Sequence, residues 1–218
     1  MATRRNTCRA CGSERLTPYL ALGVQPLANA LKPLADASDA ARAPLTVRAC
    51  TVCRLSQLTH VVDPATLYSN DYVFYAGQSK SWRTHCARLA DAFPASGKFV
   101  VDVASNDGTL LREFEARGAR ILGVDPAANF ATGEYPLVSA FWSNELANTP
   151  GIKGAVDVLC ATNVLGHVDD VHDFVAGIET ALSPSGIAII EVPYVVDMLD
   201  ALTFDLVYHE HLSYWSVT

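Results

Sequence analysis

The sequence predicts an α/β protein in which an open parallel sheet follows a small metal-binding module. Two observations predict this organisation: two Cys-x-x-Cys pairs lie in the first quarter of the chain, and strand, turn and helix alternate from about residue 98 onward. Half of the 218 residues are apolar, so the chain can bury a sizeable core. We expect the metal-binding module to occupy residues 1–65 and the sheet domain residues 66–218.

Cysteine spacing is the most specific local signal. Cys8 with Cys11, and Cys50 with Cys53, can each present two thiolates to one tetrahedral zinc ion. A four-thiolate site leaves no open coordination position, so the ion is expected to be structural and to hold a module that lacks enough core alone. Redox dithiols or disulfides are the alternatives, but neither pair lies in a βαβ setting. His60 could replace one thiolate, although a plain surface or core histidine is commoner.

The rest of the first module gives weaker signals. Residues 26–44 are rich in Ala, Pro and Asp and predict a loop or short helix, whereas residues 45–50 and 55–62 predict strands beside the second cysteine pair. The joint to the sheet domain, residues 63–77, contains four clustered aromatic side chains: Tyr68, Tyr72, Phe74 and Tyr75. We expect them to pack between domains, and a loop that closes over a ligand is the alternative.

The second module predicts five strands joined by helices. Apolar residues at helical spacing behind a serine cap at Ser79 or Ser81 predict a first helix. Strands are expected at 98–103, 120–124, 137–141, 156–161 and 186–192, with helices at 109–117, 126–131, 144–148 and 170–182. Such a sheet binds ligands at the carboxyl ends of its strands. Cys86 and Cys160 lie on apolar faces and are expected to be buried as small hydrophobes.

The turn after the first of these strands indicates the ligand. A dinucleotide fold would carry G-x-G-x-x-G there, but residues 104–108 contain only Gly108, which disfavours nicotinamide and flavin cofactors. Asp102, the polar turn, and Asp125 at the end of the next strand suit S-adenosylmethionine. That cofactor has no phosphate and needs a carboxylate to accept its ribose hydroxyls. The alternative is that the two aspartates only cap helices.

Charge and hydropathy exclude several classes of protein. Residues 1–60 carry eight Lys/Arg against three Asp/Glu, a net charge of +5, and residues 61–218 carry eight against twenty, a net charge of −12. The acidic body is a poor nucleic-acid surface, although the basic first quarter leaves RNA binding open. The longest apolar stretch, 186–196, is interrupted by Glu191 and Pro193, and the basic first residues lack a following apolar region, so we expect neither a membrane-spanning helix nor a secretory signal. A reducing cytoplasm is the expected compartment, with no membrane partner.

The last part of the chain has the composition of a proton-transfer site. Tyr208, His209, Glu210 and His211 are contiguous, and His167 follows the fourth predicted strand at the ligand edge. Histidine titrates near neutral pH and a neighbouring carboxylate can fix its tautomer, which favours acid–base chemistry. Metal binding by the two histidines of the motif, or simple packing, are the alternatives.

Together these motifs resemble the nucleotide-sugar C-methyltransferases of deoxysugar biosynthesis, and the resemblance covers essentially the whole chain. Besides the cysteine pairs, the segments that carry it are DYVFY (71–75), SNDGT (105–109), NVLGH (163–167), IEVPY (190–194) and YHEHLSYWS (208–216). The resemblance implies a Rossmann-like class I S-adenosylmethionine methyltransferase sheet. It also implies methylation of the carbon next to the ketone of a dTDP-linked 4-keto-6-deoxyhexose, at C3 or, in some members, at C5.

The resemblance also implies roles for individual residues. His211 would be the base that removes the proton from this carbon, with Tyr208 and Glu210 orienting it or contacting the sugar. His167 and Tyr75 would lie near the ketone oxygen and the sulfonium. His209 is the rival base, because spacing alone cannot choose between the two histidines. The cofactor is expected to contact Asp102, Ala104, Asn106, Gly108, Asp125 and Asn163.

The chain departs from the family pattern in two respects. Its first sheet strand ends in Asp102-Val-Ala104 where members commonly carry Glu and Gly, which predicts weaker cofactor binding. Members are also much longer, with a further domain after the Tyr-His-Glu-His motif, so the sheet would lack its last two strands. We therefore expect a fragment, or a protein partner that supplies the missing part, or a chain without catalysis. An RNA methyltransferase with a zinc recognition module and a non-catalytic accessory protein are the other functions considered.

Overall fold

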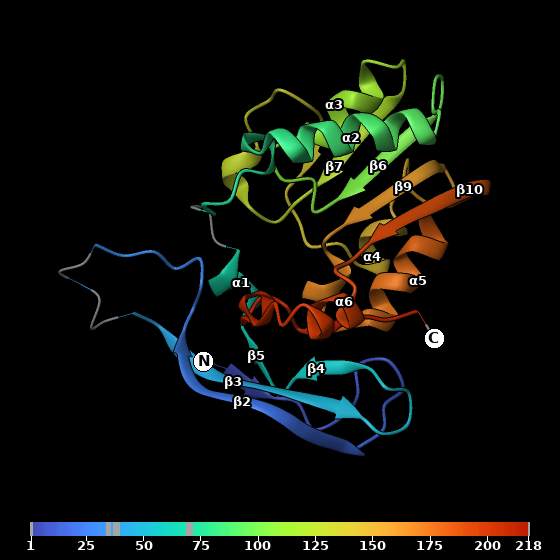
Figure 1. Ribbon diagram of the computed structural model, residues 1–218. Coiled ribbons are helices and arrows are strands. Elements are labelled where there is room, and N and C mark those ends of the chain that lie inside the picture. Colours follow the sequence, from blue (N-terminus) through green and yellow to red (C-terminus); the bar gives the residue numbers. More distant parts are fainter. Residues whose placement is uncertain (1, 34–35, 37–39, 69–71, 218) are drawn as a thin grey trace. The chain divides into compact units, whose positions relative to one another are not determined.

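The computed structural model describes residues 2–33, 36, 40–68 and 72–217, which form two compact units. We call residues 1–67, 165–171 and 192–218 the cysteine unit, and residues 68–164 and 172–191 the sheet unit. Figure 1 shows the chain coloured along its sequence, so that the late segments of the cysteine unit stand out in orange and red. Each unit is thus built from segments that are far apart in the sequence.

The sheet unit contains a five-stranded sheet of order β10-β9-β6-β7-β8, in which every neighbouring pair is parallel. Its strands are β6 (Phe99–Val103), β7 (Arg120–Val124), β8 (Leu137–Val138), β9 (Val156–Thr162) and β10 (Leu182–Glu191). The central strand, β6, is the first in sequence. The chain then adds β7 and β8 on one side of it and afterwards β9 and β10 on the other. This order confirms the predicted open parallel sheet and brings the carboxyl ends of β6, β7 and β9 to one edge.

Helices cover both faces of this sheet, α2 and α3 on one and α4 and α5 on the other (Figure 1). Their bounds are α2 (Lys80–Ala92), α3 (Thr109–Glu115), α4 (Asn144–Ala147) and α5 (Val171–Ala181), with short 3₁₀ turns η2 (Ala76–Gln78) and η3 (Ala128–Phe130). Of the two serines predicted to cap α2, Ser79 is the cap, because its hydroxyl accepts a hydrogen bond from the amide of Trp82 at 3.3 Å.

The core of the sheet unit lies between β6 and the helices α2 and α3. Val100 and Leu111 are completely buried there, and Cys86 and Cys160 are 1% and 0% exposed. The prediction that these two cysteines are buried as small hydrophobes is therefore confirmed.

The cysteine unit contains a four-stranded antiparallel sheet of order β11-β4-β3-β2 and a separate antiparallel pair, β1 with β5. Its strands are β1 (Ala2–Arg4), β2 (Leu16–Pro26), β3 (Arg42–Cys50), β4 (Ser56–Leu58), β5 (His60–Val62) and β11 (Ser213–Tyr214). Its helical segments are α1 (Pro64–Leu67), η4 (Leu165–His167), α6 (Val195–Asp200) and η5 (Phe204–Leu206). None of the helices in the described part of the chain has the length and apolar character to span a bilayer.

Two strand assignments in this unit differ from the sequence prediction. The single strand predicted over 55–62 is two strands, because the chain changes partner at Thr59 and β5 pairs with β1 instead of β3. The sequence also gave no sign of β2. This strand is largely exposed, contains Pro18 and Gly23, and shifts register twice against β3, so it has no regular apolar alternation.

The late segments pack with the cysteine unit, whereas the sequence division placed them in the sheet domain. β11 pairs with β4, and the buried side chains of Leu212 and Tyr214 join a core cluster with Val47 and Leu58. The contacts link residues more than 150 positions apart, and a pattern of local periodicity carries no information about such pairing.

Candidate functional site

Four thiols of the cysteine unit gather at one point. The Sγ atoms of Cys8, Cys11, Cys50 and Cys53 all lie within 4.8 Å of one another, and the closest pairs are 3.5 Å and 3.6 Å apart. A tetrahedron with Zn–S bonds of about 2.3 Å has S–S edges of about 3.8 Å, so the cluster fits one zinc ion. His60 is not part of the cluster, and its Nδ1 atom lies 2.7 Å from the hydroxyl of Thr59.

Both cysteine pairs lie on tight turns. Gly12 and Arg54 follow the two pairs with φ angles of 72° and 69°, and their amides donate to the carbonyls of Cys8 and Cys50. Burial alone would raise the pKa of Cys50, but donors from the turn backbone and the neighbouring thiols outweigh it and lower the pKa to about 6. The second turn therefore favours the thiolate form at Cys50, whereas burial raises the pKa of Cys8 and raises that of Cys53 to about 12.

The second group of predicted residues lies at the carboxyl edge of the parallel sheet. Ala104, Asn106 and Gly108 form the turn between β6 and α3, with φ angles of 58°, 52° and 73°. A Cβ atom on Gly108 would lie 2.6 Å from the ring of Tyr135, so packing as well as backbone conformation requires glycine here. Asn163 follows β9 at the same edge and is exposed.

Asp125 is buried at the end of β7 and is bound to the turn. Its Oδ2 atom accepts a hydrogen bond from the amide of Asn106 and its Oδ1 atom accepts one from the amide of Ala127, both at 2.9 Å. Burial raises the pKa of this carboxyl, and the two amide donors oppose the rise. Each oxygen keeps a second lone pair, so the carboxylate can fix the turn and still accept a ligand hydroxyl.

Asp102 is a buried acid of the sheet unit with an unpaired carboxyl oxygen. It is 3% exposed, and its Oδ1 atom has no hydrogen-bond partner among the described residues. Burial, and secondarily the charge of Asp125, raises the pKa of Asp102 well above its ordinary value. A buried carboxyl that lacks a donor is an unusual feature of a folded protein and marks a candidate ligand contact.

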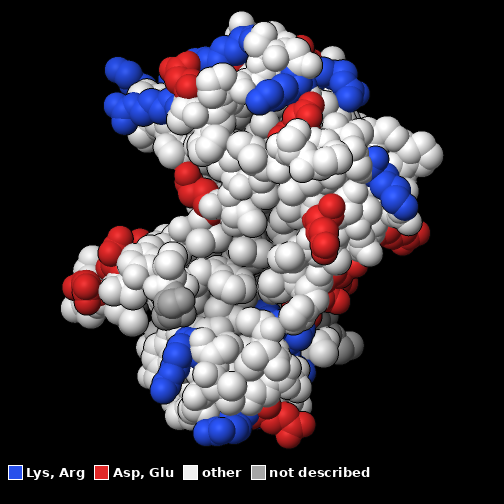
Figure 2. Space-filling view, turned by 90° about the vertical axis from the view of Figure 1, so that its right-hand side faces the viewer, with Lys and Arg blue, Asp and Glu red and all other residues white. Residues whose placement is uncertain are grey.

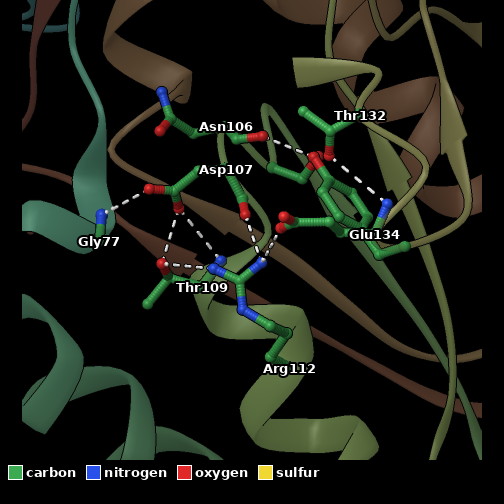
Figure 3. Close-up of polar contacts among 9 residues, drawn as sticks. Gly77, Asn106, Asp107, Thr109, Arg112, Thr132 and Glu134 are labelled. Atoms are coloured by element: carbon green, nitrogen blue, oxygen red, sulfur yellow. Dashed lines mark hydrogen bonds and ion pairs between the residues drawn. The ribbon is translucent and has the colours of Figure 1, made fainter.

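The side chains of the turn bind the segment that carries Tyr75, and Figure 3 shows one of these contacts, between Asp107 and Gly77. The Asn106 amide accepts from the backbone N–H of Ala76 and donates to the carbonyl of Phe74, each at 2.9 Å. The neighbouring Asp107 accepts from the N–H of Gly77 at 2.8 Å. A Cβ atom at position 77 would lie 2.7 Å from that carboxylate, so glycine permits this close approach.

Asp107 and its partners were not identified from the sequence. Its second oxygen accepts from the hydroxyl of Thr109 at 2.6 Å, and Arg112 donates to its backbone carbonyl at 2.7 Å. Arg112 also pairs with Glu134 at 3.7 Å (Figure 3). The turn is therefore supported by a polar network before any ligand is considered.

The aromatic side chains of the joint pack on the sheet unit. The rings of Tyr72 and Tyr75 lie 6.4 Å and 5.2 Å from the ring of Phe130, edge to face. The Asn129 amide donates to the Tyr75 hydroxyl at 3.1 Å, so both the ring and the hydroxyl of Tyr75 are fixed. Asp71, the first residue of the DYVFY motif, lies outside the described residues.

The third group is the proton-transfer motif, which lies in the cysteine unit. The hydroxyl of Tyr208 is 2.8 Å from Nε2 of His211, and Nδ1 of the same ring is 2.8 Å from the carbonyl of Leu206. A carbonyl can only accept, so the hydrogen-bond partners assign the ring proton to Nδ1. Nε2 then carries the lone pair, and Tyr208 donates to it.

Burial keeps both groups of this pair uncharged. It lowers the pKa of His211, with partial opposition from the Leu206 hydrogen bond. Burial, and then the charge of Glu210, raises the pKa of the Tyr208 phenol. At neutral pH the pair is thus a neutral imidazole that accepts a proton and a phenol that donates one.

His167 lies beside this pair. The centroids of the His167 and His211 rings are 4.9 Å apart, with an angle of 69° between the ring planes. Burial, and then the charge of His211, lowers the pKa of His167 to about 3, so its ring is also neutral. The fold therefore brings together His167 and His211, two predicted site residues that lie 44 positions apart in the sequence.

His209 has a different environment. It is 1% exposed, its Nε2 atom donates to the carbonyl of Ala43 at 3.0 Å, and its Nδ1 atom is buried without a partner among the described residues. The lone pair on Nδ1 of His209 is thus buried inside the protein, whereas the His211 side chain is partly exposed. The geometry favours His211 over His209 as the base.

Two further polar contacts were missed by sequence reasoning. The carboxylate of buried Glu210 accepts a hydrogen bond at 2.7 Å from the amide of Asn29, a residue of the predicted loop 26–44 that carried no motif. In the sheet unit, His85 on α2 lies 2.6 Å from Glu191 at the end of β10. Only their contacts in the fold identify these residues.

Comparison with known proteins gives the family. Residues 75–218 match the family described as "Methyltransferase domain", and residues 8–68 match the one described as "Putative zinc binding domain". The chain belongs to the methyltransferase-domain family. The predicted combination of a zinc-binding module with a methyltransferase domain is thereby confirmed.

Individual relatives agree with this membership. The chain is 32% identical over 221 residues to "C-methyltransferase NovU" of Streptomyces niveus, a match that covers 96% of this chain and 52% of the relative. It therefore spans about half the length of that relative. Two solved structures share the fold: a SAM dependent methyltransferase from Archaeoglobus fulgidus (TM-score 0.51, 16% identity, 66% and 65% of the two chains), and a chain from the complex of the Haloferax volcanii Trm112 methyltransferase activator (TM-score 0.53, 21% identity, 72% of each chain).

Proposed function

We propose that the chain contains the cofactor-binding sheet and the proton-transfer residues of an S-adenosylmethionine-dependent C-methyltransferase. The substrate would be a nucleotide-linked 4-keto-6-deoxy sugar, methylated at the carbon beside its ketone, at C3 with C5 as the alternative. One observation carries the proposal: His211 is a neutral imidazole whose lone pair faces the hydroxyl of Tyr208 and whose other nitrogen is fixed by Leu206. The similarity to a C-methyltransferase supports it.

The carboxyl edge of the sheet fits the cofactor. Asp102 offers an acceptor without a donor, Asp125 has spare lone pairs, and Asn163 is exposed beside them in the sheet. These groups suit the ammonium and ribose hydroxyls of S-adenosylmethionine, which supplies an electrophilic methyl group when bound. The residues that would hold it are Asp102, Ala104, Asn106, Gly108, Asp125 and Asn163. Asn106 would hold the turn in the shape that the cofactor needs, because its side-chain amide binds residues 74 and 76 and its backbone N–H donates to Asp125.

The proton of the reacting carbon would reach His211 through Tyr208. The phenol oxygen would take the proton from carbon while its own proton passes to Nε2, so no free phenolate is needed and the electron pair of the C–H bond becomes the enolate. The raised pKa of Tyr208 favours this coupled transfer over prior ionisation. The imidazolium that results would remain hydrogen-bonded through Nδ1 to Leu206.

The developing enolate oxygen needs a donor. The neutral ring of His167 would supply it beside His211, and the Tyr75 hydroxyl would contact the ketone or the sulfonium side. Glu210, held by Asn29, would contact the sugar or orient Tyr208. The four cysteines would hold a structural zinc ion, and free thiols suit a reducing cytoplasm.

A polymeric RNA substrate is less well supported. On the face of the molecule shown in Figure 2, basic side chains form separate small groups, and acidic side chains lie near several of them. The net charge of −7 adds to this argument. A protein partner that supplies a further domain would be compatible with the proposed reaction.

The test is to incubate the zinc-loaded protein with ¹³C-methyl-labelled S-adenosylmethionine and dTDP-4-keto-6-deoxyglucose. We expect the labelled methyl group on the carbon beside the ketone, located by NMR, and at least a hundredfold less product with His211→Gln. Tight binding of S-adenosylhomocysteine without methylated sugar would contradict the proposed substrate. Transfer of label to RNA, with salt-sensitive RNA binding, would replace it with the RNA function.

A further inference from the structure

A buried arginine lies between two cysteines of the metal cluster. Arg9 follows Cys8, its side chain is completely buried, and it is not one of the residues predicted to have a function. Its backbone N–H donates to the side chain of Gln57 at 2.9 Å, and Gln57 is itself fully buried. The position of Arg9 is therefore determined both by the cysteine turn and by strand β4.

The guanidinium of Arg9 contacts two different parts of the cysteine unit. Its Nε atom lies 3.0 Å from Oδ1 of Asp169, which Arg5 also contacts at 3.0 Å, and its Nη1 atom donates to the carbonyl of Leu58 at 2.9 Å. The planar guanidinium fixes the angle between these two contacts, which a lysine ammonium could not do.

Each contact leads to one of the two neighbouring histidines. Asp169 is two residues beyond His167 in the segment 165–171. On the other side, the N–H of Leu58 donates at 2.9 Å to the carbonyl of Leu212, the residue directly after His211. Arg9 thus connects the backbone next to His167 with the strand that holds the backbone next to His211.

Stability alone does not explain this arrangement. The guanidinium of Arg9 is buried, and its Nη2 atom has no partner among the described residues. A buried charge with an unsatisfied donor costs free energy, and an apolar residue at such a position is often as stable. A charged residue in this position suits a requirement for geometry.

We propose that Arg9 is a positioning residue that sets the spacing between the His167 and His211 rings. The role rests on the proposed function, because it assigns Arg9 to the geometry of the proton-transfer pair. It also gives the cysteine cluster a purpose beyond stability, since the turn that would hold the metal also holds Arg9.

The inference is tested by NMR of the full chain, in which the histidines are isotope-labelled. The chain has six histidines to assign. Ring centroids 4.9 Å apart predict a nuclear Overhauser cross-peak between the His167 and His211 ring protons. We expect this cross-peak to disappear in Asp169→Ala and in Arg9→Lys. Arg15→Lys, which changes an exposed arginine of the same unit, should leave it unchanged. Asp169→Ala keeps the test usable if Arg9→Lys does not fold, because Asp169 is partly exposed. Since Asp169→Ala also removes the ion pair with Arg5, Arg5→Lys is compared with it and should leave the cross-peak in place.

Two further readouts separate positioning from a loss of fold. The thiolate-to-metal bands of the Co²⁺-substituted protein should be retained, whereas proton exchange at the sugar carbon should fall by about tenfold to a hundredfold. A retained cross-peak with unchanged exchange in both variants, with intact cobalt bands, would overturn the inference. Exchange by the unsubstituted protein decides the proposed function separately, because the cross-peak does not depend on any substrate.

Discussion

The Tyr208 hydroxyl lies 2.8 Å from Nε2 of His211 and donates to the lone pair that a base would use. Direct attack of the imidazole on a carbon-bound proton would require this hydroxyl to leave. The relay through Tyr208 requires no such movement, so the two routes predict different behaviour when the hydroxyl is removed.

Tyr208→Phe is therefore predicted to lose proton abstraction almost as fully as a His211 variant. The loss should be about a hundredfold or more, because one positioned acid–base group typically contributes that much. The measurement is the rate of solvent deuterium incorporation beside the sugar ketone. Exchange in Tyr208→Phe that is as fast as in the unsubstituted protein, or faster, would show that His211 removes the proton directly and that the Tyr208 hydroxyl only blocks its Nε2 atom.

The pH dependence of the reaction follows from burial of His211. Its pKa is lowered from the ordinary value of 6.5, so more acid is needed to protonate and inactivate it. The acid limb of the kcat/KM profile is predicted below pH 6.5. Protonation of His167, whose pKa is about 3, should not contribute to this limb well above pH 3. An acid limb at or above pH 6.5 would contradict a buried, neutral imidazole as the base.

Asp102 is predicted to reduce stability as the pH rises. Its folded-state pKa is raised well above the unfolded value near 3.8, so the folded chain binds the extra proton and loses stability between that value and the raised pKa. Asp102→Asn should therefore be more stable than the native protein at pH 8 and nearly equal to it close to pH 4. Each unit of pKa difference is worth about 1.4 kcal/mol.

Urea unfolding of both proteins across this pH range measures the effect. If the free energies of unfolding of the two proteins change in parallel with pH, the pKa of the Asp102 carboxyl is not raised in the folded protein. The same variant should bind S-adenosylhomocysteine more weakly if Asp102 is a cofactor contact, a pattern typical of functional residues that reduce stability.

Asp107 is predicted to hold the Tyr75 segment in place. Removing its carboxylate in Asp107→Ala leaves the N–H of Gly77 without its acceptor, at a cost of about 1.5–3 kcal/mol for a hydrogen bond to a charged group. Hydrogen exchange of the peptide covering residues 74–79 should accelerate, while exchange in α5 stays constant. Glu134→Gln is the control, because Glu134 lies on the exposed rim of the same network. Unchanged protection of the segment would refute the role of Asp107.

Most of the sheet unit could be predicted from the sequence, because its signals are local. The buried run at Phe99–Val103, the turn with Gly108 and the following helix each depend on residues close together in the chain. The four metal ligands were predicted for the same reason, since each pair is a short motif with a defined chemistry.

The sequence did not predict contacts made across the cysteine unit. Asn29 binds Glu210 across 181 positions and Arg9 binds Asp169 across 160. Asn29 lies in no motif, and Arg9 occupies a variable position of the first Cys-x-x-Cys pair. The choice between His209 and His211 also needed the fold, because these residues lie in a turn closed by the amide of His211 on the carbonyl of Tyr208. Neither strand nor helix spacing applies to such a turn.

The most direct test of the account compares His211→Gln with His209→Gln. Each protein is incubated in D₂O with dTDP-4-keto-6-deoxyglucose and S-adenosylhomocysteine, and deuterium beside the ketone is followed by NMR. We predict that His211→Gln abolishes exchange, whereas His209→Gln keeps it and loses about 1–3 kcal/mol of stability, because a buried hydrogen bond to Ala43 is disturbed. Exchange that survives in His211→Gln and disappears in a folded His209→Gln would contradict the assignment of the base.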